Sequence, residues 1–173
     1  LSVDIETGVD GTLYSIGVDY FGNKSFQNVY MLSDDQKKEH ERLSFYQNER
    51  SLILAFLKDF YELDPDIIIG WHVIGFDLNF LINKCLKLKI PFNLGRDKKP
   101  LSIEEKKGLG FFTNIKGRVV IDGPPAMRSA FYSFKNYKLE TVASEVLGSS
   151  KDIASDAGKV SEIERRFKED KLS

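Results

Sequence analysis

The chain has 173 residues, of which 42% are hydrophobic and 29% charged, and its formal net charge is −1. This length is typical of one domain with its own core, and the composition excludes a disordered or collagen-like chain. No apolar run approaches the roughly 20 residues that cross a bilayer, and no secretory leader is visible. A single cysteine cannot form an internal disulfide. We therefore expect a cytoplasmic protein with no membrane partner.

The charges are distributed unevenly along the chain. Residues 1–83 hold 6 Lys and Arg against 14 Asp and Glu, whereas residues 84–139 hold 13 against 4. A basic block beside an acidic one is typical of a protein that binds a polyanion next to a carboxylate site. A solvated surface with an uneven sequence gives the same counts, so charge alone does not decide.

The first third of the chain predicts an antiparallel meander. Residues 1–7, 13–21 and 27–32 are rich in β-branched and aromatic residues and are separated by glycines. After a polar connection, residues 48–63 carry apolar side chains at helical spacing, and Asn48 is the expected N-cap.

The middle of the chain continues the alternation of strands and helices. The apolar run at 66–71 is typical of a strand buried in a sheet centre. Residues 77–88 form the clearest amphipathic helix, and Cys85 lies on its apolar stripe, which favours core packing over reactivity.

The remaining third predicts a basic loop and further elements. Residues 92–118 look like a loop, residues 117–122 a strand, and a helix is expected to start near Pro125. Residues 138–148 predict another helix and residues 161–171 a short charged one. A meander followed by alternating helices and strands indicates an α/β, three-layer domain over residues 1–173 with a mixed sheet.

Three acids stand out against this pattern. Asp4 and Glu6 share one face of the first strand, where they repel each other unless that face is exposed, a proton is shared or a cation lies between them. Asp77 starts the amphipathic helix, where an Asp is often a simple N-cap.

These segments, in this order, resemble the 3′–5′ exonuclease (proofreading) domain of family B DNA polymerases, a DEDD-type nuclease. Asp4-Ile5-Glu6 matches its Asp-x-Glu motif, and residues 72–77 match Asn-x-x-x-Phe-Asp. The stretch "YKLETVA" at 137–143 is similar to the segment before the third motif. The resemblance covers nearly the whole chain and is greatest to the bacterial DNA polymerase II branch of the family.

The resemblance implies an RNase H-like fold and a metal-dependent reaction. Asp4, Glu6 and Asp77 would be the catalytic residues and would hold two divalent ions, Mg²⁺ or Mn²⁺, which prefer oxygen ligands. The substrate would be the 3′ end of single-stranded DNA or of a frayed primer-template. The partner within the parent chain would be a polymerase domain.

The family also implies where the strand is held. The terminal nucleotide would pack against the backbone around Ile5 and Thr7 and against the ring of Phe76, and Lys138 would contact the strand. His72 stands where the family has Asn. This is either a tolerated substitution or an altered grip on the strand.

The third motif, Tyr-x-x-x-Asp, is not found in its expected place before Ser173. Tyr30 and Asp34 match its spacing but precede the second motif, which we interpret as coincidence. The remaining acids near the end have no motif around them: Asp152, Asp156 and Asp170. We therefore expect a piece that is truncated at both ends relative to its parent polymerase and is weakly active or inactive.

Several alternatives remain open at this point. The chain could be a non-catalytic single-strand DNA-binding module that uses the basic region 84–138, or an RNase H-like nuclease that acts on RNA. A haloacid dehalogenase-like phosphotransferase would need Asp4 alone as nucleophile, with Glu6 in place of its second Asp. A hydride-transfer enzyme is disfavoured because no Gly-x-Gly-x-x-Gly follows a strand.

Overall fold

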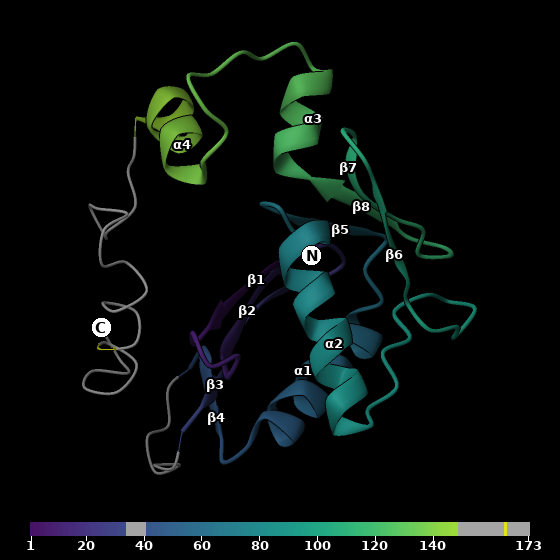
Figure 1. The fold of residues 1–173 in the computed structure, drawn as a ribbon. Coiled ribbons are helices and arrows are strands. Elements are labelled where there is room, and N and C mark those ends of the chain that lie inside the picture. Colours follow the sequence, from purple (N-terminus) through teal and green to yellow (C-terminus); the bar gives the residue numbers. More distant parts are fainter. Residues whose placement is uncertain (34–40, 149–164, 166–173) are drawn as a thin grey trace.

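The computed structural model describes residues 1–33, 41–148 and Arg165, and its centre is a six-stranded mixed sheet (Figure 1). The strand order is β4-β3-β2-β1-β5-β8. β1, β2 and β3 pair antiparallel, whereas β4, β5 and β8 run parallel to their neighbours. The strands span Ser2–Thr7 (β1), Leu13–Phe21 (β2), Ser25–Leu32 (β3), Leu43–Tyr46 (β4), Ile67–Gly70 (β5) and Val119–Asp122 (β8).

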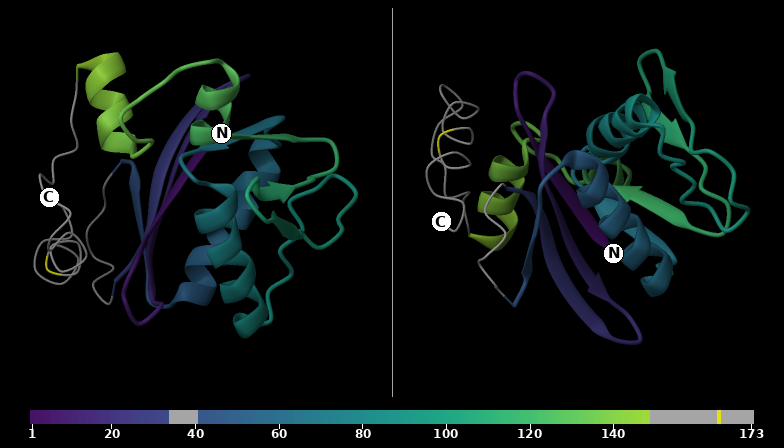
Figure 2. Two further views of the ribbon diagram at one scale, coloured as in Figure 1. Left: turned by 45° about the horizontal axis from the view of Figure 1, so that its top comes forward. Right: turned by 90° about the horizontal axis from the view of Figure 1, so that it is seen from below.

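Helices lie on both sides of this sheet. In both views of Figure 2, α1 and α2 lie on one side of β1–β3 and α4 lies on the other. The fold is therefore α/β with a mixed sheet flanked by helices, consistent with the predicted RNase H-like class. The helices span Glu49–Leu63 (α1), Ile74–Leu78 (η1, a π-helix), Asn79–Leu88 (α2), Gly123–Ser129 (α3) and Leu139–Leu147 (α4).

The core forms between α1, α2 and the face of the sheet that β1 turns toward them. Val3 and Ile5 are buried on that face, while Asp4 and Glu6 point to the other and are exposed. This division follows from the period of two along a strand. Asn48 caps α1 as predicted, since its side chain accepts the N–H of Ser51 at 2.8 Å. The partners of β1 in the core include Leu52, Ile53, Phe56 and Leu81.

Two small β elements were not predicted. β4 lies in the stretch interpreted as a polar connection, and a hairpin of β6 (Ile103–Lys106) and β7 (Gly110–Thr113) lies in the expected loop. The sequence of β6, IEEK, shows no apolar alternation, and its last three residues are exposed. A Cβ on Gly75 of η1 would come within 2.5 Å of the Phe111 ring, so β7 packs closely against η1.

Several apolar side chains that were expected to be buried are exposed in the structure. Ile68 of β5 is buried, but Ile67 and Ile69 are 46% and 43% exposed, so β5 is covered on one face only by the described residues. Leu86 of α2 and Leu147 of α4 are also exposed although they lie on predicted apolar stripes.

α3 begins at Gly123, two residues before the expected start. The predicted helix at 161–171 lies outside the described residues except Arg165. None of the described helices is long and apolar enough to cross a membrane.

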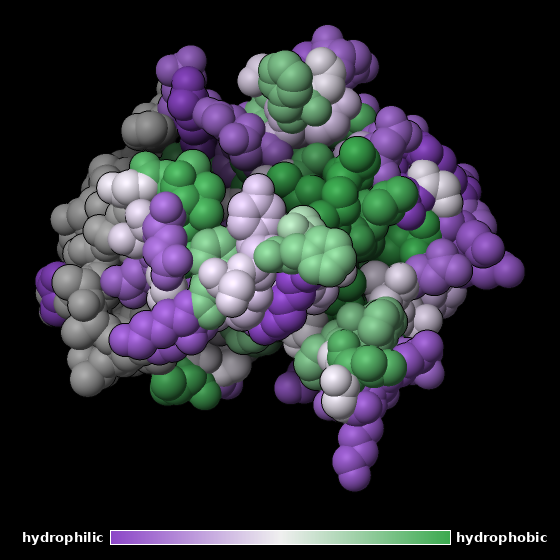
Figure 3. Space-filling view, turned by 90° about the horizontal axis from the view of Figure 1, so that it is seen from above, coloured by the Kyte–Doolittle hydropathy of each residue, from purple (hydrophilic) through white to green (hydrophobic). Residues whose placement is uncertain are grey.

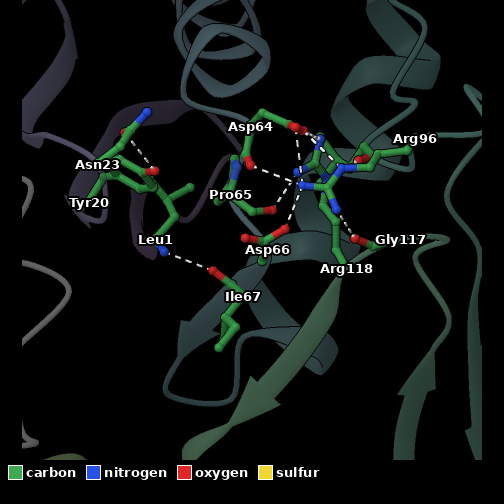
Figure 4. Close-up of polar contacts among 11 residues, drawn as sticks. Leu1, Tyr20, Asn23, Asp64, Pro65, Asp66, Ile67, Arg96, Gly117 and Arg118 are labelled. Carbon is green, nitrogen blue, oxygen red and sulfur yellow. Dashed lines mark hydrogen bonds and ion pairs between the residues drawn. The ribbon is translucent and has the colours of Figure 1, made fainter.

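An ion-pair network fastens the chain where it enters β5 and β8 (Figure 4). The Arg118 side chain is only 3% exposed, pairs with Asp64 at 2.7 Å and donates from Nε to the Leu94 carbonyl at 2.7 Å. Arg96 pairs with Asp64 at 3.1 Å and with Asp66 at 2.6 Å. The two arginines hold the pKa of the Asp64 carboxyl below its usual range.

Candidate active site

Asp4 and Glu6 occupy the sheet face that α1 and α2 leave uncovered. Asp4 pairs in register with Gly17 of β2, so no side chain stands directly across from it. Glu6 pairs with Ser15, and the register shifts between Glu6 and Thr7. Such an irregularity ends regular pairing and bends the strand at that point. The two carboxylates therefore lie side by side near the end of β1.

Asp77 reaches the same place from a distant part of the sequence. Its side chain is only 1% exposed, and its Oδ1 accepts the backbone N–H of Ile5 at 3.0 Å. Ile5 lies between Asp4 and Glu6, so the structure brings Asp77 against the middle of that pair. Asp77 belongs to the π-helix η1 and does not cap α2, whose first turn has no side-chain cap.

The local chain path explains how η1 approaches β1. β5 ends at Gly70, where a Cβ would come within 2.9 Å of the Val3 carbonyl. Only glycine permits this close approach of β5 to β1. η1 follows four residues later, and π-turns of this kind are frequent at functional sites.

Negative charge accumulates at this edge of the sheet. Burial first, and then the charges of Asp4 and Asp122, raise the pKa of the Asp77 carboxyl to about 7. The hydrogen bond from Ile5 opposes this shift because it stabilises the ionised form. The site therefore favours either a proton or a cation on Asp77 near neutral pH.

Asp122 is a member of this group that the sequence interpretation missed. It ends β8, pairs in register with Gly70, and its Oδ2 accepts the N–H of Ile74 at 3.3 Å, at the first residue of η1. Its Oδ1 is buried and has no hydrogen-bond partner among the described residues. The available signal was its place at the carboxyl end of a parallel strand, next to the strand that leads to Asp77.

Three of the predicted DNA contacts, Ile5, Thr7 and Lys138, lie in different structural settings. The Ile5 side chain is in the core, and its backbone N–H donates to Asp77. Thr7 is half-buried at the shifted register, and Lys138 is exposed at the start of α4. Contact of Ile5, Thr7 or Lys138 with DNA stays a prediction.

His72 and Phe76 flank the turn into η1. His72 has φ of +60°, a left-handed conformation in which both Asn and His are enriched among non-glycine residues. This gives a physical reason why His can replace the Asn of the family motif, and it favours a tolerated substitution. Phe76 is 50% exposed beside Asp77, so part of its ring is accessible.

The alternative Tyr-x-x-x-Asp pair does not reach this site within the described residues. Tyr30 is 1% exposed in the core, and its hydroxyl donates to Asp59 of α1 at 2.6 Å. Asp34 lies outside the described residues, as do Asp152, Asp156 and Asp170.

The donor set suits a hard divalent cation. Asp4, Glu6, Asp77 and Asp122 offer only carboxylate oxygens, which Mg²⁺ and Mn²⁺ accept, and Mg²⁺ keeps several waters, so few protein ligands suffice. The buried Oδ1 of Asp122 is a further acceptor without a partner in the described chain. In the described part of the chain, however, no three His, Cys, Asp or Glu residues are close enough to hold an ion. The residues are therefore of the type that binds Mg²⁺ or Mn²⁺, but those in the described part of the chain form only part of a ligand set.

Comparison with known proteins agrees with this geometry. Residues 14–142 match the family described as DNA polymerase family B, exonuclease domain. The chain is 40% identical over 177 residues to DNA polymerase II of Escherichia coli K12, an alignment that covers 99% of this chain and 22% of that protein. It is 39% identical over 105 residues to the DNA polymerase of Thermococcus litoralis, covering 60% of this chain and 6% of that one.

The chain thus spans about a fifth of the length of the Escherichia coli relative. The family match covers well over half of the chain, and the resemblance to the DNA polymerase II branch is confirmed at the level of sequence identity. The chain belongs to the exonuclease domain family of family B DNA polymerases.

Proposed function

We propose that this chain is the metal-dependent 3′–5′ exonuclease domain of a DNA-directed DNA polymerase and removes 3′-terminal nucleotides from single-stranded or frayed DNA. The observation that carries the proposal is the position of Asp77, buried and hydrogen-bonded to the strand between Asp4 and Glu6. Membership of the family supports the same activity.

Asp4, Glu6 and Asp77 would hold two divalent ions, Mg²⁺ or Mn²⁺. When bound, such ions stabilise the charge that develops on the attacking and leaving oxygens of a phosphodiester. Ion binding would also compensate the charge of Asp77, whose pKa is raised to about 7 by burial and by the nearby charges of Asp4 and Asp122. The chain supplies the fixed part of this arrangement, because the Ile5 N–H holds one carboxylate oxygen of Asp77 in place.

The substrate end would lie against Phe76. Its half-exposed ring next to Asp77 offers a flat apolar surface, and stacking on aromatic rings is the usual way of holding an unpaired base. An unpaired end suits this surface better than a duplex end, since its base faces are accessible. The selection of frayed ends follows from this requirement.

Mutation of the acids in the full-length parent protein tests the proposal. A 5′-labelled single-stranded DNA should shorten from its 3′ end in Mg²⁺, and Asp4→Ala and Asp77→Ala should each reduce the rate more than about 100-fold. Loss of residues that only support metal ligands typically costs 10–100-fold. Asp19→Ala is the matched control, since Asp19 is an exposed acid on β2 opposite Ser2, and it should keep the rate within about twofold.

The same assay separates the alternatives. Equal degradation of an RNA oligonucleotide would favour an RNA nuclease, and binding without cleavage in the full-length protein would favour a binding module. We also propose that residues 1–173 alone are weakly active or inactive, because the third motif is missing from them. Equal turnover by this piece and by a longer one with Tyr-x-x-x-Asp would contradict that part.

A further inference from the structure

An unusual surface lies in the connection between α3 and α4. Within residues 123–138 the sequence contains no Asp or Glu, three cations and four aromatic residues. The aromatic ones are Phe131, Tyr132, Phe134 and Tyr137, and we refer to residues 131–137 as the aromatic segment. Figure 3 looks down on the face that carries α3, α4 and this connection, where hydrophobic side chains gather beside polar ones.

The rings of the aromatic segment hold one another in a defined arrangement. Tyr132 and Phe134 stack with centroids 6.1 Å apart and planes 5° apart, and Phe134 meets Tyr137 edge-on at 5.6 Å. The Tyr137 hydroxyl donates to the Tyr132 carbonyl at 2.6 Å, which closes the loop. The Arg128 guanidinium lies 3.9 Å from the centre of the Tyr137 ring. The segment is thus ordered by its own side chains.

The outermost ring is exposed at a conformational cost. Phe131 is 95% exposed and has φ of +62°, a left-handed conformation that is rare for a bulky residue. Tyr132 beside it is 55% exposed. A strained backbone that presents an apolar ring to solvent is more typical of a binding surface than of simple packing.

The aromatic segment is anchored beside the candidate active site. The Trp71 indole N–H donates to the Tyr137 carbonyl at 3.0 Å, and Trp71 precedes the turn into η1. A cleft of about 650 Å³ lies next to the segment, since Ala130 and Leu139, on either side of residues 131–137 in the sequence, both line it. Its lining joins Asp4 and Trp71 to α3 and to Leu139, the first residue of α4. A strand that extends from this cleft past Ala130 and Leu139 would meet the aromatic segment.

We propose that the aromatic segment is a stacking platform for the single-stranded DNA upstream of the terminal nucleotide. The inference rests on the proposed nuclease function and adds a second place where the strand is held. Exposed aromatic faces bind successive bases without regard to sequence, and the three cations attract the phosphates. The absence of any acid over residues 123–138 favours a polyanion over a protein partner of mixed charge.

The test measures how the full-length protein uses oligothymidylates of about four and about sixteen nucleotides, the range over which such platforms bind. In single-turnover degradation, the double variant Phe131→Ala/Tyr132→Ala should raise the half-saturating concentration of the long oligonucleotide about tenfold. The maximal rate and the half-saturation for the short oligonucleotide should stay within about twofold. Phe21→Ala is the matched control, because Phe21 is 91% exposed elsewhere and should change neither value.

Further variants separate stacking from simple apolar contact. Phe131→Trp keeps an aromatic face and should keep the affinity, whereas Phe131→Leu keeps only apolar bulk and should weaken binding severalfold. Lys135→Ala should lower the slope of log affinity against log salt by about 0.7. A double variant with unchanged half-saturation would overturn the proposal. So would a Leu variant that behaves like wild type, since that result assigns the surface to packing against another part of the protein.

The two proposals fail in different ways. Wild-type protein that does not degrade DNA at all contradicts the nuclease function. In that case the platform is still tested by fluorescence anisotropy with the labelled long oligonucleotide in EDTA, where the double variant should bind about tenfold more weakly than Phe21→Ala. Equal anisotropy curves for these two variants would overturn the platform alone.

Discussion

The two ends of the paired strands β5 and β8 carry similar numbers of acids in opposite electrostatic settings. At the entry end, Asp64 and Asp66 meet two arginines, and the pKa of Asp64 is lowered. At the exit end, Asp77 lies near Asp4 and Asp122, and burial together with these two charges raises the pKa of Asp77 to about 7. The acids at the entry end are paired with arginines, and we call it the compensated end. The acids at the exit end lie near one another, and we call it the repulsive end.

The difference indicates which end stabilises the fold and which end is available for chemistry. Paired and hydrogen-bonded charges hold the chain where β5 and β8 begin, and nothing further is needed there to balance them. Crowded acids reduce stability unless a proton or a cation joins them, and groups with pKa values shifted in this way cluster at functional sites. The following predictions test this contrast.

The largest effect is expected at the compensated end. Arg118→Ala removes a side chain that is 3% exposed and takes a donor from the carbonyls of Leu94 and Pro65, so the unfolding free energy should fall by about 3 kcal/mol. Urea unfolding followed by circular dichroism measures this. Lys58→Ala breaks an exposed pair with Glu62 and should cost no more than about 0.5 kcal/mol. A loss below about 1 kcal/mol for Arg118→Ala would show that the network is dispensable.

At the repulsive end, removing a charge should stabilise the protein. The folded pKa of Asp77 lies near 7, above its ordinary value, so its favourable contribution is complete at low pH and is lost as pH rises toward and through 7. Without divalent ions, Asp77→Asn should therefore add about 2 kcal/mol of stability at about pH 8.

The pH series supplies the control for that substitution. At about pH 4 the carboxyl of wild type is already protonated, so the gain from Asp77→Asn should be close to zero. Fluorescence of Trp71, the only tryptophan in the chain, reports unfolding near the site. A gain in stability that does not depend on pH would mean that the packing of the side chain, and not its charge, determines the effect of Asp77→Asn.

A cation should have the same effect as removing the charge. Mg²⁺ at several times its dissociation constant should raise the stability at about pH 8 by about 1 kcal/mol. The rise should disappear in Asp77→Ala and persist in Asp64→Asn, since the second variant changes the distant end. An equal response of both variants would place the bound ion elsewhere.

The smallest effect is expected for Asp64→Asn, and its sign should be opposite to that of Asp77→Asn. Asp64 is paired, and its lowered pKa means that its contribution is present above the ordinary pKa and is lost as pH falls below it. The loss of stability should be smaller than for Arg118→Ala, because Arg118 still donates hydrogen bonds to the carbonyls of Leu94 and Pro65. Melting temperatures at about pH 8 and pH 3 test this. A rise in melting temperature would remove the contrast between the two ends.

Local patterns were enough to predict most of the regular elements. The period of two in the first seven residues separates Val3 and Ile5 from Asp4 and Glu6, and the structure keeps that separation. The antiparallel meander and α1 with its cap at Asn48 follow the same local rules. Cys85 is buried as its apolar stripe predicted, and burial raises the pKa of its thiol to about 12.

Features that depend on distant residues were harder to predict. The hydrogen bond between Ile5 and Asp77 joins residues 72 positions apart, and only the family resemblance suggested that they meet. Asp122 joins the site through the pairing of β8 with β5, a register that no local pattern encodes. The hairpin β6–β7 depends on the contact of Phe111 with Gly75, and its charged first strand gave no strand signal.

The π-helix η1 makes the spacing of this part of the chain as important as its composition. A π-turn contains one residue more than the α-helical turn it replaces, and each residue of an α-helix rotates the next by about 100°. Deleting a single residue from 74–78 would let an unbroken α-helix form and would swing the Asp77 carboxylate away from the Ile5 amide. Point substitutions in η1 should therefore be tolerated more readily than any change in its length.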